Sequence, residues 1–468
     1  MLAHHLPKQG IEFFGGLFEV DVTGPHAERR PVAVLAHREV GVDEKRRAGR
    51  QTADPADQAG VSGVESVLQV LHQRAGIELA PGLTEPDLRR AMERMAERNA
   101  GIAPGAVFLG GGAYPHVAPT VVNHVLLRSE FATAYTPYQP EVSQGTLQAI
   151  FEFQTLIAEL TALDVANASL YDGATAVAEA AMMAHIHTGR NEIVVSGYLH
   201  PEYLEVLRAF SDGRGIKVRK GTEPGPKTAA VIFQQPDFLG LLVDARSLTE
   251  NAHAAGALAI ACVDPISLAI LAPPGEYGAD IAVGEGQQLG LSPSYGGPHV
   301  GFISCRKELV RRLPGRLIGT AYDKEGRRGF NLALAAREQH IRREKATSNI
   351  CTNHSLCALA ASVYMTYMGP DGLRQVAEVG FKRAHALAAR LEALPGWERA
   401  FPERQFLNEF PMRVPKGPAV LRKLARKGIL GPLDVHRWFR ELKGVLTFTC
   451  TEVNDHHALD ELVTALES

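Results

Sequence analysis

Residues 278–302 read GADIAVGEGQQLGLSPSYGGPHVGF. The short apolar run ADIAV, followed by turn residues, predicts a buried strand. A polar turn at Gly286-Gln287-Gln288 comes next, then a Gly-Gly-Pro loop and a second apolar run, HVGFISC, from His299. The turn lacks a reactive amine, because the amide of a glutamine cannot form an imine. The stretch is therefore either ordinary structure or part of a chain that relies on a second subunit for the reactive group.

The chain on either side of this stretch alternates apolar strands with helices. Further strands are predicted at EIVVSG from Glu192, AAVIFQQP from Ala229 and ALAIACVDP from Ala257. Helical patterns lie between them at residues 175–187, 201–210 and 245–255. Strands joined by helical crossovers predict an α/β fold, with a parallel sheet covered by helices on both faces.

The remaining segments define the expected domain organisation. A helix is predicted over 83–99, opened by Thr84 with Pro86 in its first turn, and another over 144–163. After Arg306 the pattern is mostly helical and ends in two short strands, NEFPMRV and VLTFTCTEV. We expect an atypical segment at 1–60, an N-terminal helical arm at 61–130, a large α/β domain at 131–350 and a small α+β domain at 351–468.

Composition excludes several classes of function. The 468 residues are 45% hydrophobic and 22% charged, and 49 basic against 52 acidic side chains give a net charge of −3. This balance argues against nucleic-acid binding, and the longest apolar run, 257–271, is broken by Asp264-Pro265 and does not predict a membrane span. Five cysteines are scattered without metal-binding spacing, so we expect no metal site and a reducing, cytoplasmic location: Cys262, Cys305, Cys351, Cys357 and Cys450.

The loop TAYTPYQPEVSQG, residues 133–145, has the composition of a functional site. Pro137 and Pro140 restrict its backbone, and the loop leads into a long predicted helix. The plain structural interpretation is an N-cap for that helix. Rigid aromatic hydroxyls on a proline frame favour ligand contact instead, and four side chains are the candidates: Tyr135, Tyr138, Glu141 and Ser143.

Three further segments carry weaker signals. SLYDGAT, residues 169–175, precedes an Ala-rich helix and offers backbone amides to an anion, although any Asp-Gly turn before a helix looks similar. Asp264 follows a strand and could pair with a pyridinium nitrogen, or simply form an Asp-Pro turn. The charge run REQHIRREKATSN, residues 337–349, is either a solvated helix face or an arm that contacts a carboxylate or phosphate.

Six stretches together resemble the glycine cleavage system P-protein, a pyridoxal-phosphate (PLP) dependent glycine decarboxylase. They are FLGGGAYPHVAP, TAYTPYQPEVSQG, NASLYDGATA, GADIAVGEGQQLGL, YGGPHVGF and REQHIRREKATSNICTN. The resemblance covers about residues 83–468, is specific to the first subunit of the two-chain form, and does not extend to residues 1–60. It implies a PLP-dependent transferase fold of type I (aminotransferase-like), with a mostly parallel central sheet and a smaller C-terminal α+β domain.

The resemblance also implies a division of labour. In this family the Schiff-base lysine lies only in the second subunit, and overlaying that subunit's lysine loop at the Gly-Gly-Pro end puts Gln287 at the lysine position. PLP is then expected to be bound covalently to the partner. The implied partners are glycine decarboxylase subunit 2, in an α2β2 heterotetramer, lipoylated H-protein, which accepts the aminomethyl group, and glycine. Tyr135, Tyr138, Glu141 and Ser143 would face the partner's coenzyme as catalytic contributions.

Two other interpretations remain open at this point. The chain could be a non-catalytic subunit that only stabilises the PLP-bearing partner. It could also be a self-sufficient PLP enzyme that uses Lys307 or Lys345, although neither lies at the strand-to-loop position expected for such a lysine.

Overall fold

The computed structural model describes residues 81–99, 101–294 and 296–467, so the predicted atypical segment 1–60 lies outside the described residues. The chain divides into two compact units after Gly101. In the first, helix α3 (Glu85–Ala96) begins as expected: Thr84 caps it by accepting a hydrogen bond from the Asp87 amide at 3.4 Å. Pro86 occupies the first turn, where a missing N–H has no cost.

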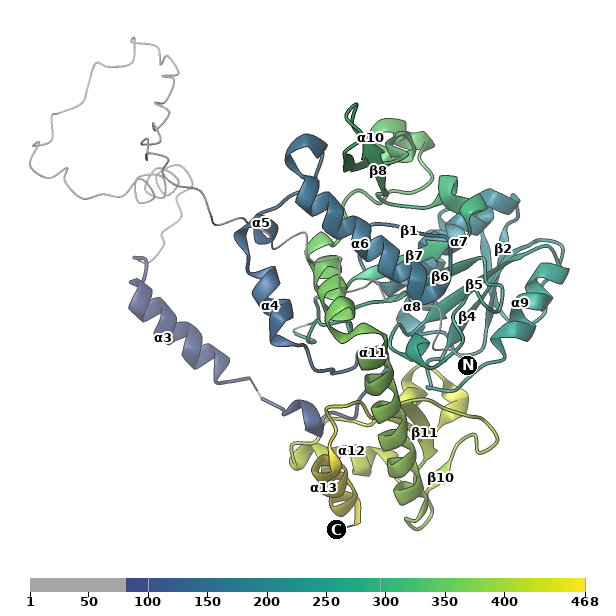
Figure 1. Cartoon of the computed structure of the whole chain (residues 1–468). Coiled ribbons are helices and arrows are strands. Elements are labelled where there is room, and N and C mark those ends of the chain that lie inside the picture. The colour runs from purple at the N-terminus through teal and green to yellow at the C-terminus, as the bar shows by residue number, and fades with distance from the viewer. Residues whose placement is uncertain (1–80, 100, 295, 468) are drawn as a thin grey trace, which may run out of the picture. The chain divides into compact units, whose positions relative to one another are not determined.

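The second unit is built around a seven-stranded sheet (Figure 1). Its strands lie in the order β1-β7-β6-β5-β4-β2-β3. Five of them are parallel: β2 (Glu192–Ser196), β3 (Lys217–Lys220), β4 (Thr228–Gln235), β5 (Leu258–Val263) and β6 (Ile281–Glu285). Two strands are antiparallel to their neighbours: β7 (Gly301–Cys305), which lies between β6 and β1, and β1 (Val165–Ala166), which lies at the edge. The predicted mostly parallel sheet is confirmed.

The direction of β7 follows from its connection. The described residues between 286 and 300 contain no helix, and the crossover that joins two parallel neighbouring strands is usually helical. The chain therefore turns back, and Ile281 pairs with Cys305 in antiparallel register. The predicted mostly parallel sheet includes this antiparallel strand.

Helices cover both faces of the sheet, as the alternation of buried strand residues requires. Val194 and the other strand side chains that point to the same face of the sheet pack in one core cluster, beneath α6 (Gln144–Thr161) and α9 (Ala245–Ala254). Ile193 and Val195 pack in a second cluster, beneath α7 (Gly173–Thr188) and α8 (Pro201–Asp212). The predicted helices are thus present at these positions. Helices α4 (Thr120–Leu126) and α5 (Ser129–Ala132) precede α6.

The C-terminal part combines a long helix with a small sheet. Helix α11 (Ser355–Glu392) bends at Gly369, which adopts φ 60°, before Pro370, and contributes to two cores along its length (Figure 1). The small antiparallel sheet has the order β10-β11-β13-β12, from Glu398–Arg399, Glu409–Arg413, Val445–Thr449 and Leu433–Asp434. Helices α12 (Gly417–Arg426) and α13 (His456–Glu467) complete it. The sequence predicted this α+β character, and the exact domain boundaries stay a prediction.

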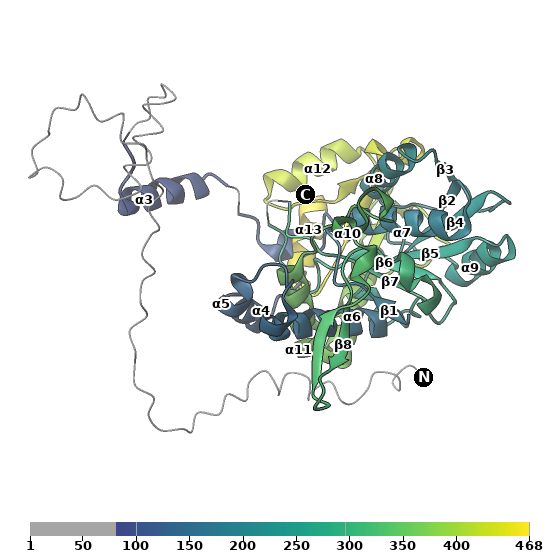
Figure 2. The same ribbon diagram turned by 90° about the horizontal axis from the view of Figure 1, so that it is seen from above.

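One segment differs from the expected helical pattern. Strands β8 (Ile318–Tyr322) and β9 (Arg328–Leu332) form a hairpin that projects away from the central sheet (Figure 2). Asp323 fixes its turn by accepting hydrogen bonds from the amides of Glu325 at 3.0 Å and Arg327 at 2.8 Å. Side-chain capping of this kind favours a turn over a helix.

Short helical turns make up the remaining elements. Besides α10 (Gln339–Arg342), they are η3 (Pro104–Ala106), η4 (Pro140–Val142), η5 (Ser267–Ala269), η6 (Lys307–Arg312), η7 (Ala335–Arg337), η8 (Arg343–Lys345), η9 (Val435–Arg437) and η10 (Arg440–Leu442). The charge run 337–349 is therefore broken into turns rather than forming one solvated helix face. Among the described residues, no helix has the length and apolar character needed to cross a membrane.

Candidate active site

The carboxyl ends of the parallel strands meet the N-terminus of α7 around a small cavity. Cys262 and Asp264 reach it from the end of β5, and Glu285 from the last position of β6. The cavity has a volume of about 40 Å³. Open α/β sheets bind ligands at this edge, so the fold places the predicted Asp264 where a ligand-binding acid would lie.

Asp264 is held by three donors on one oxygen. Its Oδ1 accepts hydrogen bonds from the amides of Ile266 at 2.8 Å and Ser267 at 3.1 Å, and from Gln288 Nε2 at 3.0 Å. The interpretation of Asp-Pro as a turn is therefore correct as local structure. Burial raises the pKa of Asp264 above its ordinary value, and the backbone hydrogen bonds oppose that shift.

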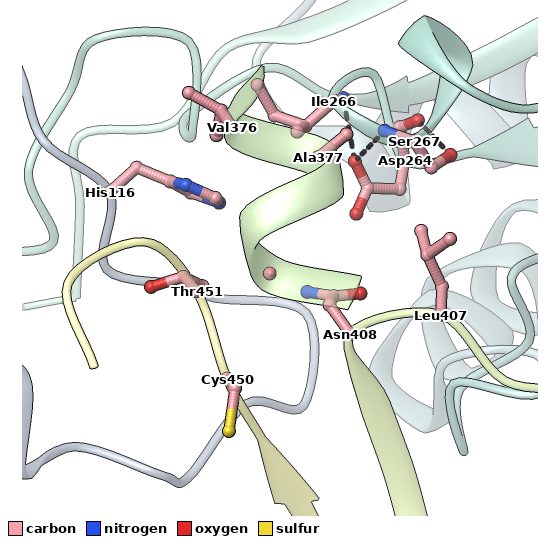
Figure 3. Close-up of a pocket in the computed structure, with 11 residues that line it drawn as sticks. His116, Asp264, Ile266, Ser267, Val376, Ala377, Leu407, Asn408, Cys450 and Thr451 are labelled. Atoms are coloured by element: carbon pink, nitrogen blue, oxygen red, sulfur yellow. Dashed lines mark hydrogen bonds between the residues drawn. The ribbon is translucent and has the colours of Figure 1, made fainter. Parts of the chain in front are cut away.

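A second, smaller cavity of about 10 Å³ lies on the other side of Asp264, which Figure 3 shows opposite His116. The sequence revealed no partner for His116, yet its Nδ1 lies 2.7 Å from Glu452 Oε2. The two residues are 336 positions apart, so no local pattern could have indicated the pair. This volume holds about one water molecule, which makes the cavity a packing feature rather than a substrate site.

Two of the amides at the N-terminus of α7 that SLYDGAT offered to an anion are bonded within the chain. Gly173 N donates to Glu285 Oε2 at 3.0 Å, and Thr175 N donates to Asp172 Oδ1 at 2.7 Å. Glu285 Oε1 accepts two further amides, from Gln287 and Val300, each at 2.9 Å. The anion at this helix N-terminus is thus a carboxylate of the chain itself.

The two glutamines of the turn have different surroundings. Both are buried, with 2% and 6% of Gln287 and Gln288 exposed. The Gln287 amide turns away and donates to the Leu291 carbonyl, whereas Gln288 lines the larger cavity and contacts Asp264. The resemblance put Gln287 at the lysine position, which stays a prediction; of the two side chains, Gln288 is the one that lines the cavity.

The four loop candidates lie together before α6. Tyr135 and Tyr138 are 78% and 51% exposed, Glu141 is exposed, and Ser143 is half-buried. Ser143 occupies the N-cap position of α6, but its side chain makes no capping hydrogen bond, so the N-cap interpretation does not explain it. None of the four lines the 40 Å³ cavity; they occupy a separate surface.

This surface is supported from behind by contacts that the sequence did not indicate. Gln144 accepts a hydrogen bond from Phe330 N at 2.8 Å and donates to Pro140 O at 2.7 Å, which ties the loop to β9. Arg316, 2% exposed, donates to the Tyr138 hydroxyl at 3.3 Å, with its guanidinium 5.4 Å from the centre of the ring. The nearby sequence RLIGT gave no indication of this role.

The basic run 337–349 separates into two kinds of residue. Arg337 is partly buried and donates to the Leu313 carbonyl, and burial lowers its pKa. Arg342, Arg343 and Lys345 are exposed. Their predicted contact with a carboxylate or phosphate stays a prediction. No cluster of three or more His, Cys, Asp or Glu side chains in the described segments is arranged to hold a metal ion.

Known proteins with similar sequences share one description. The family model of the glycine cleavage system P-protein matches residues 59–466. A protein of Moorella thermoacetica, "probable glycine dehydrogenase (decarboxylating) subunit 1", is 50% identical over 404 residues, which are 83% of this chain and 90% of the relative. The protein of the same name from Carboxydothermus hydrogenoformans is 45% identical, over 87% of this chain and 95% of the relative.

Solved structures agree with this grouping. A crystal structure of glycine decarboxylase (P-protein) of the glycine cleavage system, in inhibitor-bound form, matches with a TM-score of 0.80 and 43% identity, covering 89% of this chain and 99% of that chain. Sphingosine-1-phosphate lyase of Burkholderia pseudomallei matches with a TM-score of 0.61 at 12% identity, covering 84% and 92%, and shows the shared fold alone. The fold is that of the type I PLP-dependent enzymes. The chain belongs to the glycine cleavage system P-protein family.

Proposed function

We propose that this chain is the lysine-lacking subunit 1 of a two-subunit glycine decarboxylase. With subunit 2 it decarboxylates glycine and transfers the aminomethyl group to the lipoyl arm of H-protein. The observation that carries the proposal is the lining of the 40 Å³ cavity, which contains Gln288 where an amine is needed and, among the described residues, includes no lysine. The names of the relatives, each a subunit 1, support a partner chain.

The partner chain is proposed to hold PLP covalently, in an α2β2 assembly located in the cytoplasm. The coenzyme supplies the electron sink that allows glycine to lose its carboxylate. In support of the location, Cys262, Cys305 and the other cysteines are free thiols.

The contribution of this chain is proposed to come from the exposed loop. Tyr135 and Tyr138 present large, rigid side chains to solvent, and such residues are enriched at the centres of interfaces. Their hydroxyls can hydrogen-bond a substrate carboxylate without adding a mobile charge, while their rings exclude water. Glu141 and Ser143 lie on the same loop and are proposed to face the partner's coenzyme with them.

The observations disfavour a self-sufficient enzyme. Lys307 begins η6, after the last strand of the sheet, and Lys345 ends η8; neither lines the cavity. The remaining alternative, a subunit that only stabilises its partner, predicts loop variants that change assembly and leave chemistry intact.

The experiment compares these two roles in the assembled complex. Tyr135→Phe and Glu141→Gln are co-expressed with the lysine-bearing chain, and glycine-dependent carbon dioxide exchange is measured with lipoylated H-protein. We expect both variants to co-elute with the partner like the wild type and to lose at least about tenfold in exchange rate, a typical effect of removing one positioned polar group. Tyr367→Phe, an exposed tyrosine on α11, is the matched control. Unchanged exchange rates in both loop variants would remove the loop from the active site.

A further inference from the structure

We infer that the cavity at the carboxyl ends of the parallel strands, where a PLP enzyme of this fold would hold its coenzyme, is occupied by this chain's own side chains Glu285, Tyr203 and Gln288. Introducing a lysine alone therefore does not restore PLP binding. The residues around the strand ends therefore do not fit the coenzyme. The inference concerns this chain by itself and does not depend on whether the 133–145 loop takes part in catalysis.

The first element of the filling is at the place where a phosphate would bind. Phosphates bind to the free amides at a helix N-terminus. At α7, the amide of Gly173 is bonded to Glu285 at 3.0 Å, and that of Thr175 to Asp172 at 2.7 Å. A phosphate dianion would have to displace one carboxylate and lie beside another, which is unfavourable in a partly buried site.

Glu285 is also fixed in this position. Its other oxygen accepts the amides of Gln287 and Val300, each at 2.9 Å, and His299 Nδ1 lies 3.4 Å from the oxygen that contacts α7. The N-terminus of α7, the turn after β6 and the residue before β7 thus all hold one carboxylate. Rotating it away would break several hydrogen bonds to the carboxylate at once.

The second element lies where the pyridine ring would be. In a pyridoxal enzyme the lysine joins the aldehyde carbon, and the acid pairs with the ring nitrogen on the opposite side of the ring. The width of the ring must therefore separate the two side chains. Here Gln288 Nε2 contacts Asp264 Oδ1 directly at 3.0 Å, so the Gln288 side chain itself occupies the space that the ring would need.

The third element is an aromatic side chain from α8. The Tyr203 ring stacks on His200, with 4.4 Å between ring centres and 18° between planes. Its hydroxyl reaches the start of α7, where a Cβ placed on Gly173 would lie 2.5 Å from it. Tyr203 also lines the cavity, so this ring occupies part of the pocket next to the helix N-terminus.

What remains has neither the size nor the charge for the coenzyme. The cavity volume of about 40 Å³ accommodates about three water molecules. Its lining includes the acidic side chains Asp237, Asp264 and Glu285. Behind Tyr114, which also lines the cavity, the buried Glu409 accepts a hydrogen bond from the Tyr114 hydroxyl at 2.8 Å. An acidic surround of this kind disfavours an anionic ligand.

The test restores the amine with and without removing the filling. Full-length Gln288→Lys and the triple variant Gln288→Lys/Glu285→Ala/Tyr203→Ala are incubated with PLP, reduced with borohydride and digested. Peptide mass then measures the pyridoxyl adduct at position 288. We expect background labelling in the single variant and stoichiometric labelling in the triple variant. Stoichiometric labelling of the single variant, or background labelling of a folded triple variant, would overturn the inference.

A matched control uses the neighbouring glutamine. Gln287→Lys in the same Glu285→Ala/Tyr203→Ala background is expected to stay at background at position 287, because that side chain points to the Leu291 carbonyl. Equal labelling at positions 287 and 288 would contradict the different directions of the two side chains and would overturn the inference. Partner-free chain and assembled complex are both assayed, since peptide mass separates adducts on this chain from those on its partner.

A second measurement serves if the triple variant does not fold. The thermal midpoint is recorded with and without inorganic phosphate for wild type and for Glu285→Ala alone. We expect a phosphate-dependent rise only in the variant, because only there is the Gly173 amide at the start of α7 released. An equal rise in the wild type would show that Glu285 does not occupy the anion position. These results do not depend on the proposed function. If the 133–145 loop variants left carbon dioxide exchange unchanged, the labelling and phosphate results would still show that Glu285, Tyr203 and Gln288 close the pocket.

Discussion

Replacing Arg316 by methionine tests how the exposed loop is supported. The guanidinium is 2% exposed and donates to Asn353 Oδ1 at 3.2 Å and to the Tyr138 hydroxyl at 3.3 Å. The nearest carboxylate is that of Glu338, with 4.0 Å between Arg316 Nε and Glu338 Oε2. Methionine keeps an unbranched apolar side chain and removes the charge and every donor.

The magnitude follows from what the substitution leaves behind. Glu338 is 6% exposed, and removing one member of a buried ion pair costs about 3–5 kcal/mol. His340 Nδ1 lies 3.7 Å from the same carboxylate and partly compensates, so we expect the lower end, about 3 kcal/mol. Glu338→Gln removes the stranded charge, and the double variant should recover more than about 1 kcal/mol.

Thermal unfolding of wild type, both single variants and the double variant gives the coupling. Arg328→Met is the control, because Arg328 is exposed and stacks on Phe151 and Phe330 at 5.8 and 5.0 Å; we expect it to lose less than about 1 kcal/mol. Additive effects of the Arg316 and Glu338 substitutions would refute the argument that the two side chains form one buried unit.

Three further outcomes are expected. Tyr138→Phe keeps the ring contact with Arg316, so the complex should assemble normally while carbon dioxide exchange falls; equal rates would contradict a role for its hydroxyl. Burial raises the pKa of Glu409 from 4.5 to about 7, so the stability due to its protonated form is complete below pH 4.5 and is lost as pH rises through about 7. Glu409→Gln should therefore flatten the thermal midpoint between pH 5 and 8, as measured by scanning calorimetry, and an unchanged slope would rule this out. The methyl group of Gly301→Ala would overlap the backbone oxygen of Asp172, so this variant should yield little folded protein. Gly145→Ala places its methyl group in open space on α6 and should raise the free energy of unfolding by about 1 kcal/mol. Comparable soluble yields of the two variants would argue against the close approach at Gly301.

The central sheet could be predicted because its signals are local. Runs such as EIVVSG and ALAIACV show strand length and boundaries directly, and the helices between them show helical spacing. The capping of α3 by Thr84 was likewise legible from adjacent residues. The antiparallel direction of β7 also has a local signal, because the Gly- and Pro-rich sequence between it and β6 shows no helical pattern.

The site was less predictable because its contacts join distant segments. Arg316 and Tyr138 are 178 residues apart, and Tyr114 and Glu409 are 295 apart, so neither pair leaves a pattern in the sequence. The choice between Gln287 and Gln288 depends on which way a side chain points just after a strand, where a shift of one residue reverses the direction. An overlay of two loops that is anchored only at the Gly-Gly-Pro end cannot resolve a difference of one residue.

Helix α11 limits how this protein can be divided. Its first half, from Ala358 to Ala377, packs with the large sheet, while Ala384 to Leu391 pack with the small one. A cut before Ser355 would strip the large sheet of an apolar cover, and a cut after Glu392 would leave the helix end without its neighbours. We therefore expect neither half to be obtained as a stable fragment, and the two sheets to melt together.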